Sequence, residues 1–168
     1  MNNASNHDVL AVHSVDEFVF SVPDLEPARH FYTSFGLDVR DEGGALALYT
    51  FDNPHRWARV LPDPGARKRL RWVSFGIATD DVSRFERHLD ARGVARIEPP
   101  AAADRDGIWI GGPDGVPIQL RVAAKCSPSQ PAPREFPPQS ANVGRAPSRS
   151  RTAAVRPLYL SHVLFFSA

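Results

Sequence analysis

The spacing of apolar residues near the start of the chain predicts a strand followed by a helix. Residues 15–22 form a β-prone run rich in Val and Phe, and the run ends at Pro23. Asp24 is a favourable N-cap for a helix that would stop at Gly36. One apolar face of that helix would consist of Ala28, Phe31, Tyr32 and Phe35, which follow one another at helical spacing.

The same order of elements is expected a second time. After the first helix, two or three short strands are expected, with 45–51 and 57–61 assigned to them. A second β-prone run, residues 72–78, precedes a helix capped by Asp80 or Asp81. The buried stripe of this second helix would be Val82, Phe85 and Leu89. The remaining strands are expected at 94–97, 108–110 and 117–122.

A direct alignment of the two halves supports an internal repeat. Placing Glu17 on Trp72 brings Phe18 onto Val73 and leads each β-run into an aspartate at the start of a helix. A full order of elements repeated at one offset indicates a duplicated unit. We therefore predict an α+β fold in which two β-α-β-β-β modules, about 14–62 and 70–123, form one domain at 14–123.

Composition changes sharply after this domain. Residues 124–157 are dominated by Pro, Ser, Ala and Arg, and such a segment is predicted to be a linker, disordered or extended like polyproline II. Residues 158–168 then read as an apolar strand of the same style as the first. This strand is expected to be the truncated start of a second domain and to dock on a sheet edge, because an exposed apolar strand promotes aggregation.

Charge and cysteine content narrow the class of protein. The 168 residues carry a formal net charge of +1, and acids and bases are interspersed over the folded part, which gives no electrostatic footprint for nucleic acid. Cys126 is the single cysteine, which excludes an intrachain disulfide and suits a reducing compartment. No signal peptide and no apolar run long enough to cross a membrane is found. A cytoplasmic protein is expected.

Two sequence motifs carry a family resemblance. Residues 15–37 and the turn and strand at 112–120 resemble the opening and closing of a vicinal-oxygen-chelate module, which glyoxalases, bleomycin-resistance proteins and type I extradiol dioxygenases share. The resemblance implies paired β-α-β-β-β modules around a cavity, with metal ligands on the first and closing strands. It covers residues 14–123, and residues 158–168 again.

The ligand positions implied by the resemblance are poorly filled. The first-strand position, usually His, is Glu17 in one module and Trp72 in the other, and the closing-strand position is Gln119. The corresponding strand of the first module offers Arg59. These vestigial cavity positions leave too few donors for a divalent ion, so no metal is expected on residues 14–123.

This departure resembles the metal-free N-terminal domain of an extradiol ring-cleavage dioxygenase. His162 aligns with Glu17 and Trp72 and would be one ligand of an incomplete site, with Fe(II) or Mn(II) implied for the intact protein. A small catechol-type substrate and a homo-oligomer are implied, with no nucleic acid or membrane partner. The chain alone is expected to be inactive.

Another function remains open from the sequence. A metal-free module pair can act as a ligand-sequestering protein of the bleomycin-resistance type, and Trp57, Trp72 and Trp109 would then line an aromatic cavity. A purely structural support for a catalytic half is a third possibility. Among the other histidines, His55 is expected in a surface loop and His88 on the solvated face of the second helix.

Overall fold

A computed structural model describes residues 9–112, 114–126 and 156–160. The strands are β1 (Ser14–Val22), β2 (Asp38–Glu42), β3 (Ala45–Tyr49), β4 (Arg56–Pro62), β5 (Arg69–Ile77), β6 (Ile108–Gly111) and β7 (Pro117–Val122). The helices are α1 (Leu25–Phe35) and α2 (Val82–Ala91), and a 3-10 turn, η1 (Thr79–Asp81), leads into α2.

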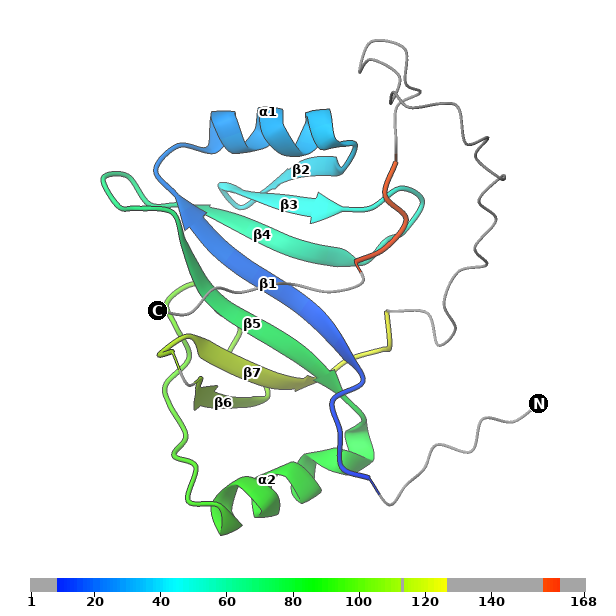
Figure 1. Cartoon of the computed structure of the whole chain (residues 1–168), viewed down its shortest axis with the longest axis vertical. Coiled ribbons are helices and arrows are strands. Elements are labelled where there is room, and N and C mark those ends of the chain that lie inside the picture. The colour runs from blue at the N-terminus through cyan, green and yellow to red at the C-terminus, as the bar shows by residue number, and fades with distance from the viewer. Residues whose placement is uncertain (1–8, 113, 127–155, 161–168) are drawn as a thin grey trace, which may run out of the picture.

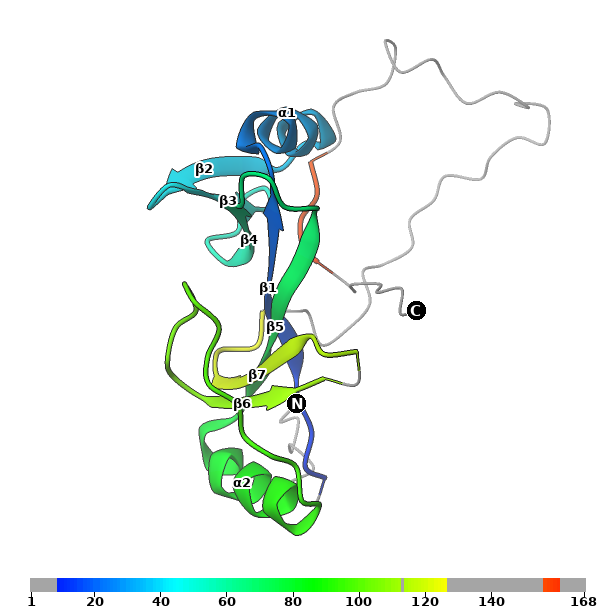
Figure 2. The same cartoon turned by 90° about the vertical axis from the view of Figure 1, so that its left-hand side faces the viewer.

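All seven strands belong to one mixed sheet. Their order is β2-β3-β4-β1-β5-β7-β6, with β1 and β5 antiparallel at the centre (Figure 1). Figure 2 shows these two strands side by side through the middle of the molecule, with α1 at one end and α2 at the other. The predicted α+β class and the pairing of two modules are confirmed.

Strand register confirms the internal repeat at the level of single residues. Phe18 pairs with Ala58 as Val73 pairs with Ile118, each across a parallel pair of strands. One residue further, Arg59 lies opposite Val19 as Gln119 lies opposite Ser74. Arg59 and Gln119 therefore occupy equivalent closing-strand positions in the two modules.

Helix α1 begins and ends where the sequence predicts. The Asp24 carboxylate accepts a hydrogen bond from the Glu26 amide, and Gly36 adopts a left-handed φ of 100°. The predicted apolar face is only partly right. Leu25, Ala28 and Tyr32 pack against the core of the first module, which is formed by Val22, Leu46, Leu48, Ala58 and Val60.

Both phenylalanines of α1 lie outside the core. Phe31 and Phe35 are 61% and 58% exposed, although their spacing predicted burial. They line an apolar groove of about 290 Å³ together with Phe18, Leu48 and Trp57. Helical spacing identified the apolar side of α1. It did not indicate how far the sheet extends beneath the helix, and therefore which of these side chains would be covered.

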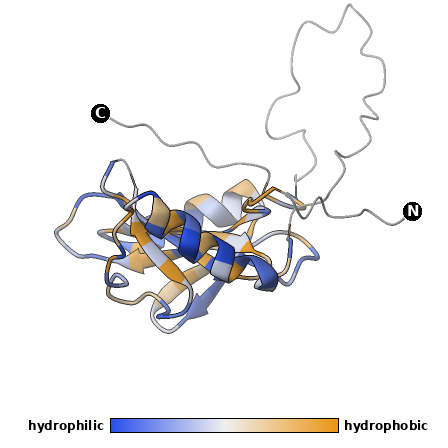
Figure 3. Ribbon diagram, turned by 90° about the horizontal axis from the view of Figure 1, so that it is seen from below, coloured by the Kyte–Doolittle hydropathy of each residue, from blue (hydrophilic) through white to orange (hydrophobic). Residues whose placement is uncertain are grey.

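Helix α2 buries the predicted stripe but lacks the predicted cap. Phe85 and Leu89 are buried against the second module, whose core includes Ile77 and Leu120. Asp81 makes no capping hydrogen bond, because the η1 turn precedes the helix and Asp81 pairs with Arg84 instead. Figure 3, seen from the α2 side, shows the hydrophilic outer surface of this helix, where His88 is exposed as predicted.

One predicted strand does not form, and one unpredicted strand does. Residues 94–97 make only an isolated bridge, Arg96 to Ile110, so the second module contributes three strands to the sheet where four were expected. Pro99 and Pro100 lack the N–H groups that a longer ladder requires, and Arg96 is tied back to the Glu86 carbonyl of α2. Strand β2 escaped prediction because its polar residues lie on an exposed sheet edge.

The beginning of the apolar strand predicted at residues 158–168 lies against the first module. The Phe51 amide donates to the Pro157 carbonyl at 2.8 Å, and Thr50 Oγ1 donates to the Leu158 carbonyl at 2.8 Å. Docking within the chain therefore occurs, but at the loop after β3 and not at a strand edge, and residues 156–160 form no strand. Residues 161–168 and most of the predicted linker lie outside the described residues.

Candidate functional site

Glu17, Trp72 and Gln119 lie in one connected network on the sheet. Each is buried, at 3%, 1% and 2% exposure respectively. Arg59 touches both Glu17 and Trp72, and Trp109 continues the network from Trp72 towards Gln119. The structure therefore brings together the three positions that the sequence analysis assigned to a vestigial cavity.

The Glu17 carboxylate is already neutralised by two arginines. Arg56 Nε donates to Glu17 Oε1 at 2.7 Å, and Arg59 Nη2 donates to Oε2 at 3.0 Å. Arg59 Nε adds bonds of 3.1 and 3.2 Å to the same group. A metal ion at Glu17 would have to displace both guanidinium groups from a buried carboxylate.

Trp72 fills the equivalent position of the second module with an aromatic ring. The ring meets Trp109 edge-on at a centroid distance of 6.2 Å, and the guanidinium carbon of Arg59 lies 5.4 Å from its centroid. With Val19 these two tryptophans form a separate buried cluster. Trp72 offers no electron pair for coordination, and its side chain occupies the space that a ligand and its ion would need.

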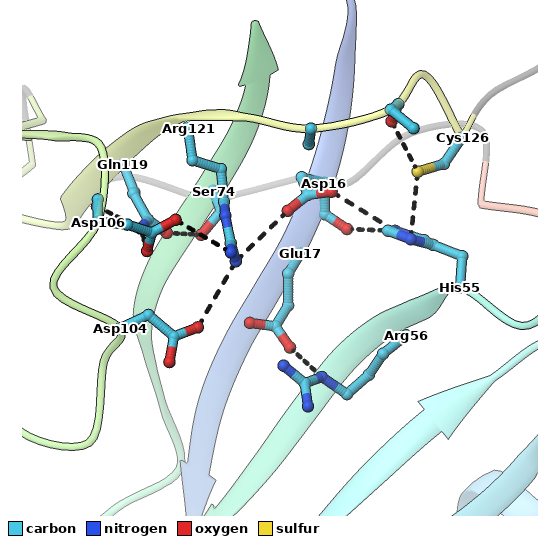
Figure 4. Close-up of polar contacts among 12 residues, drawn as sticks. Asp16, Glu17, His55, Arg56, Ser74, Asp104, Asp106, Gln119, Arg121 and Cys126 are labelled. Carbon is cyan, nitrogen blue, oxygen red and sulfur yellow. Dashed lines mark hydrogen bonds and ion pairs between the residues drawn. The ribbon is translucent and has the colours of Figure 1, made fainter.

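Gln119 is held by hydrogen bonds on both sides of its amide. Ser74 Oγ donates to its Oε1 at 2.5 Å, and its Nε2 donates to the Asp106 carbonyl at 2.9 Å and to Asp106 Oδ1 at 3.1 Å (Figure 4). These partners satisfy both the oxygen and the nitrogen of a neutral amide, which is a poorer metal ligand than a carboxylate. The family's metal does not fit the residues at the three vestigial positions.

The described residues also contain a polar pocket that the sequence analysis missed. It has a volume of about 320 Å³, and charged side chains surround it. Its lining consists of Asp16, Glu17, His55, Arg56, Arg121, Val122 and Ala123.

His55 and Cys126 meet at this pocket. His55 Nδ1 lies 3.2 Å from Cys126 Sγ, and burial, together with the charge of Asp16, raises the pKa of that thiol. His55 is thus not the plain loop residue that the sequence suggested. Its contacts span 39 and 71 residues of sequence, so no local motif announces them.

His162, the predicted metal ligand, lies outside the described residues. The three tryptophans proposed for an aromatic cavity are each at most 4% exposed. Trp57 borders the apolar groove beside α1. Trp72 and Trp109 are core residues of the sheet.

Comparison with known proteins identifies the class of this fold. The sequence profile of the Glyoxalase/Bleomycin resistance protein/Dioxygenase superfamily matches residues 14–120. The chain belongs to this superfamily. None of the helices in the described residues has the length and hydropathy needed to cross a bilayer.

One relative with a curated description is similar to nearly the whole of this chain. Metapyrocatechase 2 of Cupriavidus necator is 36% identical to this chain over 157 residues, which is 94% of this chain and 48% of the relative. The chain therefore spans about half the length of that protein.

Solved structures share the fold at low identity. A catechol 2,3-dioxygenase superposes with a TM-score of 0.55 at 19% identity, covering 66% of this chain and 41% of that one. The 2,2',3-trihydroxybiphenyl 1,2-dioxygenase of Sphingomonas wittichii gives 0.55 at 23% identity, covering 70% and 43%. The Mn(II)-bound glyoxalase of Novosphingobium aromaticivorans gives 0.53 at 15% identity, covering 69% and 40%.

Proposed function

We propose that this chain is the N-terminal, metal-free part of an extradiol, catechol-type ring-cleavage dioxygenase and that it does not cleave catechols by itself. The observation that carries the proposal is the double ion pair of Glu17 with Arg56 and Arg59, which already neutralises the carboxylate that a metal ion would need. The alignment with the relative named metapyrocatechase, over about half its length, supports the assignment to one half of such an enzyme.

In this proposal the chemistry belongs to the other half of the protein. An Fe(II) or Mn(II) ion there would hold both catechol oxygens and O₂ together and stabilise developing charge. His162 would be one of its ligands. Residues 14–123 would form a rigid neighbouring domain whose network of Glu17, Arg59 and Trp72 keeps water and ions out of the vestigial cavity.

A chimera tests this proposal. In the chimera, this chain replaces the aligned half of metapyrocatechase 2. Ring cleavage is measured with Fe(II) and a panel of catechols, by O₂ consumption and by the formation of yellow product. We expect activity from the chimera, none from the chain alone, and loss of activity in the chimera carrying His162→Gln. His88→Gln, on the exposed face of α2, is the matched control and should change nothing.

Cleavage by the unmodified chain at rates above free Fe(II) would contradict the proposal. Reading the coding DNA past codon 168 is an independent check. An open frame with a further His and Glu at module spacing would support the assignment to a dioxygenase.

The second candidate function is ligand sequestration, and the apolar groove beside α1 favours it. Exposed Phe31 and Phe35 border this groove with Trp57, and an aromatic ligand stacked there would quench tryptophan emission. Quenching that is lost in Trp57→Phe but kept in Trp109→Phe would support binding in the groove. No quenching across aromatic and glycopeptide panels would remove this candidate.

A further inference from the structure

Three potential metal ligands from distant parts of the sequence meet at the edge of the polar pocket. Asp16 lies in β1, His55 precedes β4, and Cys126 follows β7. One ligand atom from each lies within 4.8 Å of the other two. Figure 4 shows the His55 ring in contact with both Asp16 and the Cys126 sulfur, and Arg121 reaching towards the Asp16 carboxylate.

An irregularity in β1 places Asp16 there. Val15 pairs with Phe75 and Glu17 pairs with Ser74, so Asp16 is an extra residue without a counterpart on β5. In a regular strand, consecutive side chains point to opposite faces. Here Asp16 and Glu17 both line the polar pocket. Bulges of this kind re-aim side chains and are frequent beside functional sites.

The hydrogen bonds of His55 identify the nitrogen that is available to a metal. Nε2 lies 2.7 Å from the backbone carbonyl of Asp16, which can only accept, so Nε2 carries a proton. In the neutral ring Nδ1 then holds the lone pair, and Nδ1 faces Cys126 Sγ at 3.2 Å. A ligating histidine is usually oriented in this way, by a hydrogen bond from its other ring nitrogen to a carbonyl or carboxylate.

The nitrogen and sulfur are spaced as co-ligands of one ion. Bond lengths of about 2.0–2.1 Å for Zn–N and about 2.3 Å for Zn–S place two tetrahedral ligands about 3.5 Å apart. The observed 3.2 Å requires only a small outward movement. Cys126 Sγ also lies 3.1 Å from the Ala124 carbonyl, an acceptor that the thiol can use when no metal is bound.

The burial and contacts of Asp16 also bear on a metal at this position. Its residue is 7% exposed, yet its carboxylate oxygens lie 3.9 Å from His55 Nε2 and 3.8 Å from Arg121 Nη1. Both distances are too long for hydrogen bonds. Both contacts of this buried carboxylate are therefore long ion pairs, and a bound cation would compensate its charge at shorter range.

The neighbouring cations do not block such an ion. Arg121 is held at 3.6 Å by Asp104 and at 3.1 Å by Asp106, and Arg56 is bound to Glu17 and Glu42. Both guanidinium groups therefore have carboxylate partners other than Asp16, and those of Arg121 lie closer to it than Asp16 does at 3.8 Å. The pocket of about 320 Å³ leaves room for water as a fourth ligand.

We propose that Asp16, His55 and Cys126 form a binding site for a divalent transition metal of the zinc type. Mixed N, S and O donors favour Zn²⁺ and its spectroscopic substitute Co²⁺, and the Asp16 carboxylate, within 4.8 Å of the other ligand atoms, would move inward on binding. The site uses none of the three vestigial positions as a ligand, although Glu17 lines the same pocket, and it takes one ligand from beyond residue 123. A bound ion would tie the segment after β7 to β1 and to the loop before β4, and would stabilise the folded chain by mass action.

Cobalt titration of the metal-free full-length chain tests this site. We expect one Co²⁺ per chain, a thiolate-to-cobalt charge-transfer band in the near ultraviolet, displacement by Zn²⁺, and a rise in melting temperature with Zn²⁺. Cys126→Ser should abolish the band. His55→Gln and Asp16→Asn should each weaken affinity by more than the roughly 10–100-fold that is lost when a residue that only hydrogen-bonds to a ligand is removed.

Matched variants distinguish this site from nonspecific metal binding at surface residues. His88→Gln and Asp80→Asn change exposed residues of the same types and should leave the titration unchanged. His162→Gln removes the ligand proposed for the catalytic half and should also retain the band. Circular dichroism verifies that each variant is folded. Absence of a band in the folded parent chain, or its persistence in Cys126→Ser, would overturn the proposal.

Discussion

Arg59 and Glu17 form the ion pair on which the interpretation of this domain depends. Arg59 Nη2 donates to Glu17 Oε2 at 3.0 Å, and the two side chains are 15% and 4% exposed. Strand register places Arg59 where the second module has Gln119, one of the positions at which the family resemblance implies a metal ligand. In the proposed function, the Arg59 guanidinium therefore supplies the positive charge beside Glu17 that a metal ion would otherwise supply.

Removing Arg59 should destabilise the domain strongly. Arg59→Leu leaves Glu17 buried with Arg56 as its remaining partner, and loss of one member of a buried pair costs about 3–5 kcal/mol. We expect a loss of about 3 kcal/mol in the urea unfolding free energy, at the lower end of that range, since Arg56 remains.

Arg40→Gln is the control for that measurement. Arg40 pairs with Asp38 on the exposed edge strand β2, so its loss should cost less than about 1 kcal/mol. Equal effects of the two substitutions would show that the Glu17–Arg59 pair has no special importance.

Restoring a family-like carboxylate at Gln119 should not restore a metal site. Gln119→Glu replaces the amide N–H donors by an oxygen facing the Asp106 carbonyl and carboxylate. We expect destabilisation of about 1–3 kcal/mol at neutral pH, because two acceptors then lack a donor. Protonation of the new carboxyl at lower pH should reduce this loss relative to the parent chain. A variant as stable as the parent that also binds Fe(II) would contradict the account.

The first module could be predicted largely from sequence because local signals and burial agree there. Asp24 and Gly36 bound α1, and alternation fixes β1. The prediction of a strand at 94–97 was wrong because it rested on apolar content and did not take account of the two prolines that follow these residues. Phe31 and Phe35 were misassigned because helical spacing gives a face but not its depth of burial.

The polar pocket could not be predicted from sequence. Asp16 reaches it through a bulge, which alternation of side chains does not encode. Cys126 lies 71 residues from His55, and the topology of the sheet brings the two together. Conversely, Glu17, Trp72 and Gln119 were singled out through the family resemblance. The internal repeat aligns Glu17 with Trp72, and strand register aligns Gln119 with Arg59.

Acid and alkali should each weaken the first module through Glu42 and Tyr49. The hydrogen bond from Tyr49, and then Arg56, lowers the pKa of Glu42 below its ordinary 4.5, so its stabilising contribution is present above that pH and is lost as pH falls through the lowered pKa. Burial, and then Glu42, raises the pKa of Tyr49 above 10.0, so stability should fall as pH rises past 10.

The pH dependence of the urea midpoint checks this assignment. In Tyr49→Phe both losses should become smaller, since the phenol is gone and Glu42 loses its first partner. Tyr159→Phe alters a tyrosine in the C-terminal segment and should keep the parent profile. Identical profiles for Tyr49→Phe and the parent would refute the linkage.

The apolar groove beside α1 should control association. A homo-oligomer is expected for this chain, and exposed Phe31 and Phe35 would lie at its interface. Replacing both by Ser should lower the mass observed by light scattering while leaving the urea midpoint nearly unchanged, because neither ring is buried in the chain. Truncation after residue 126 removes residues 157–160 from the groove and should alter solubility or oligomeric state.

The central claim is that the vestigial positions hold no catalytic iron. Anaerobic equilibrium dialysis of the Cys126→Ser chain against Fe(II) tests it most directly, because that variant lacks the separate site proposed at the polar pocket. The account predicts no bound iron above a carrier-protein control. Stoichiometric iron that disappears on Glu17→Gln or Gln119→Leu would contradict it.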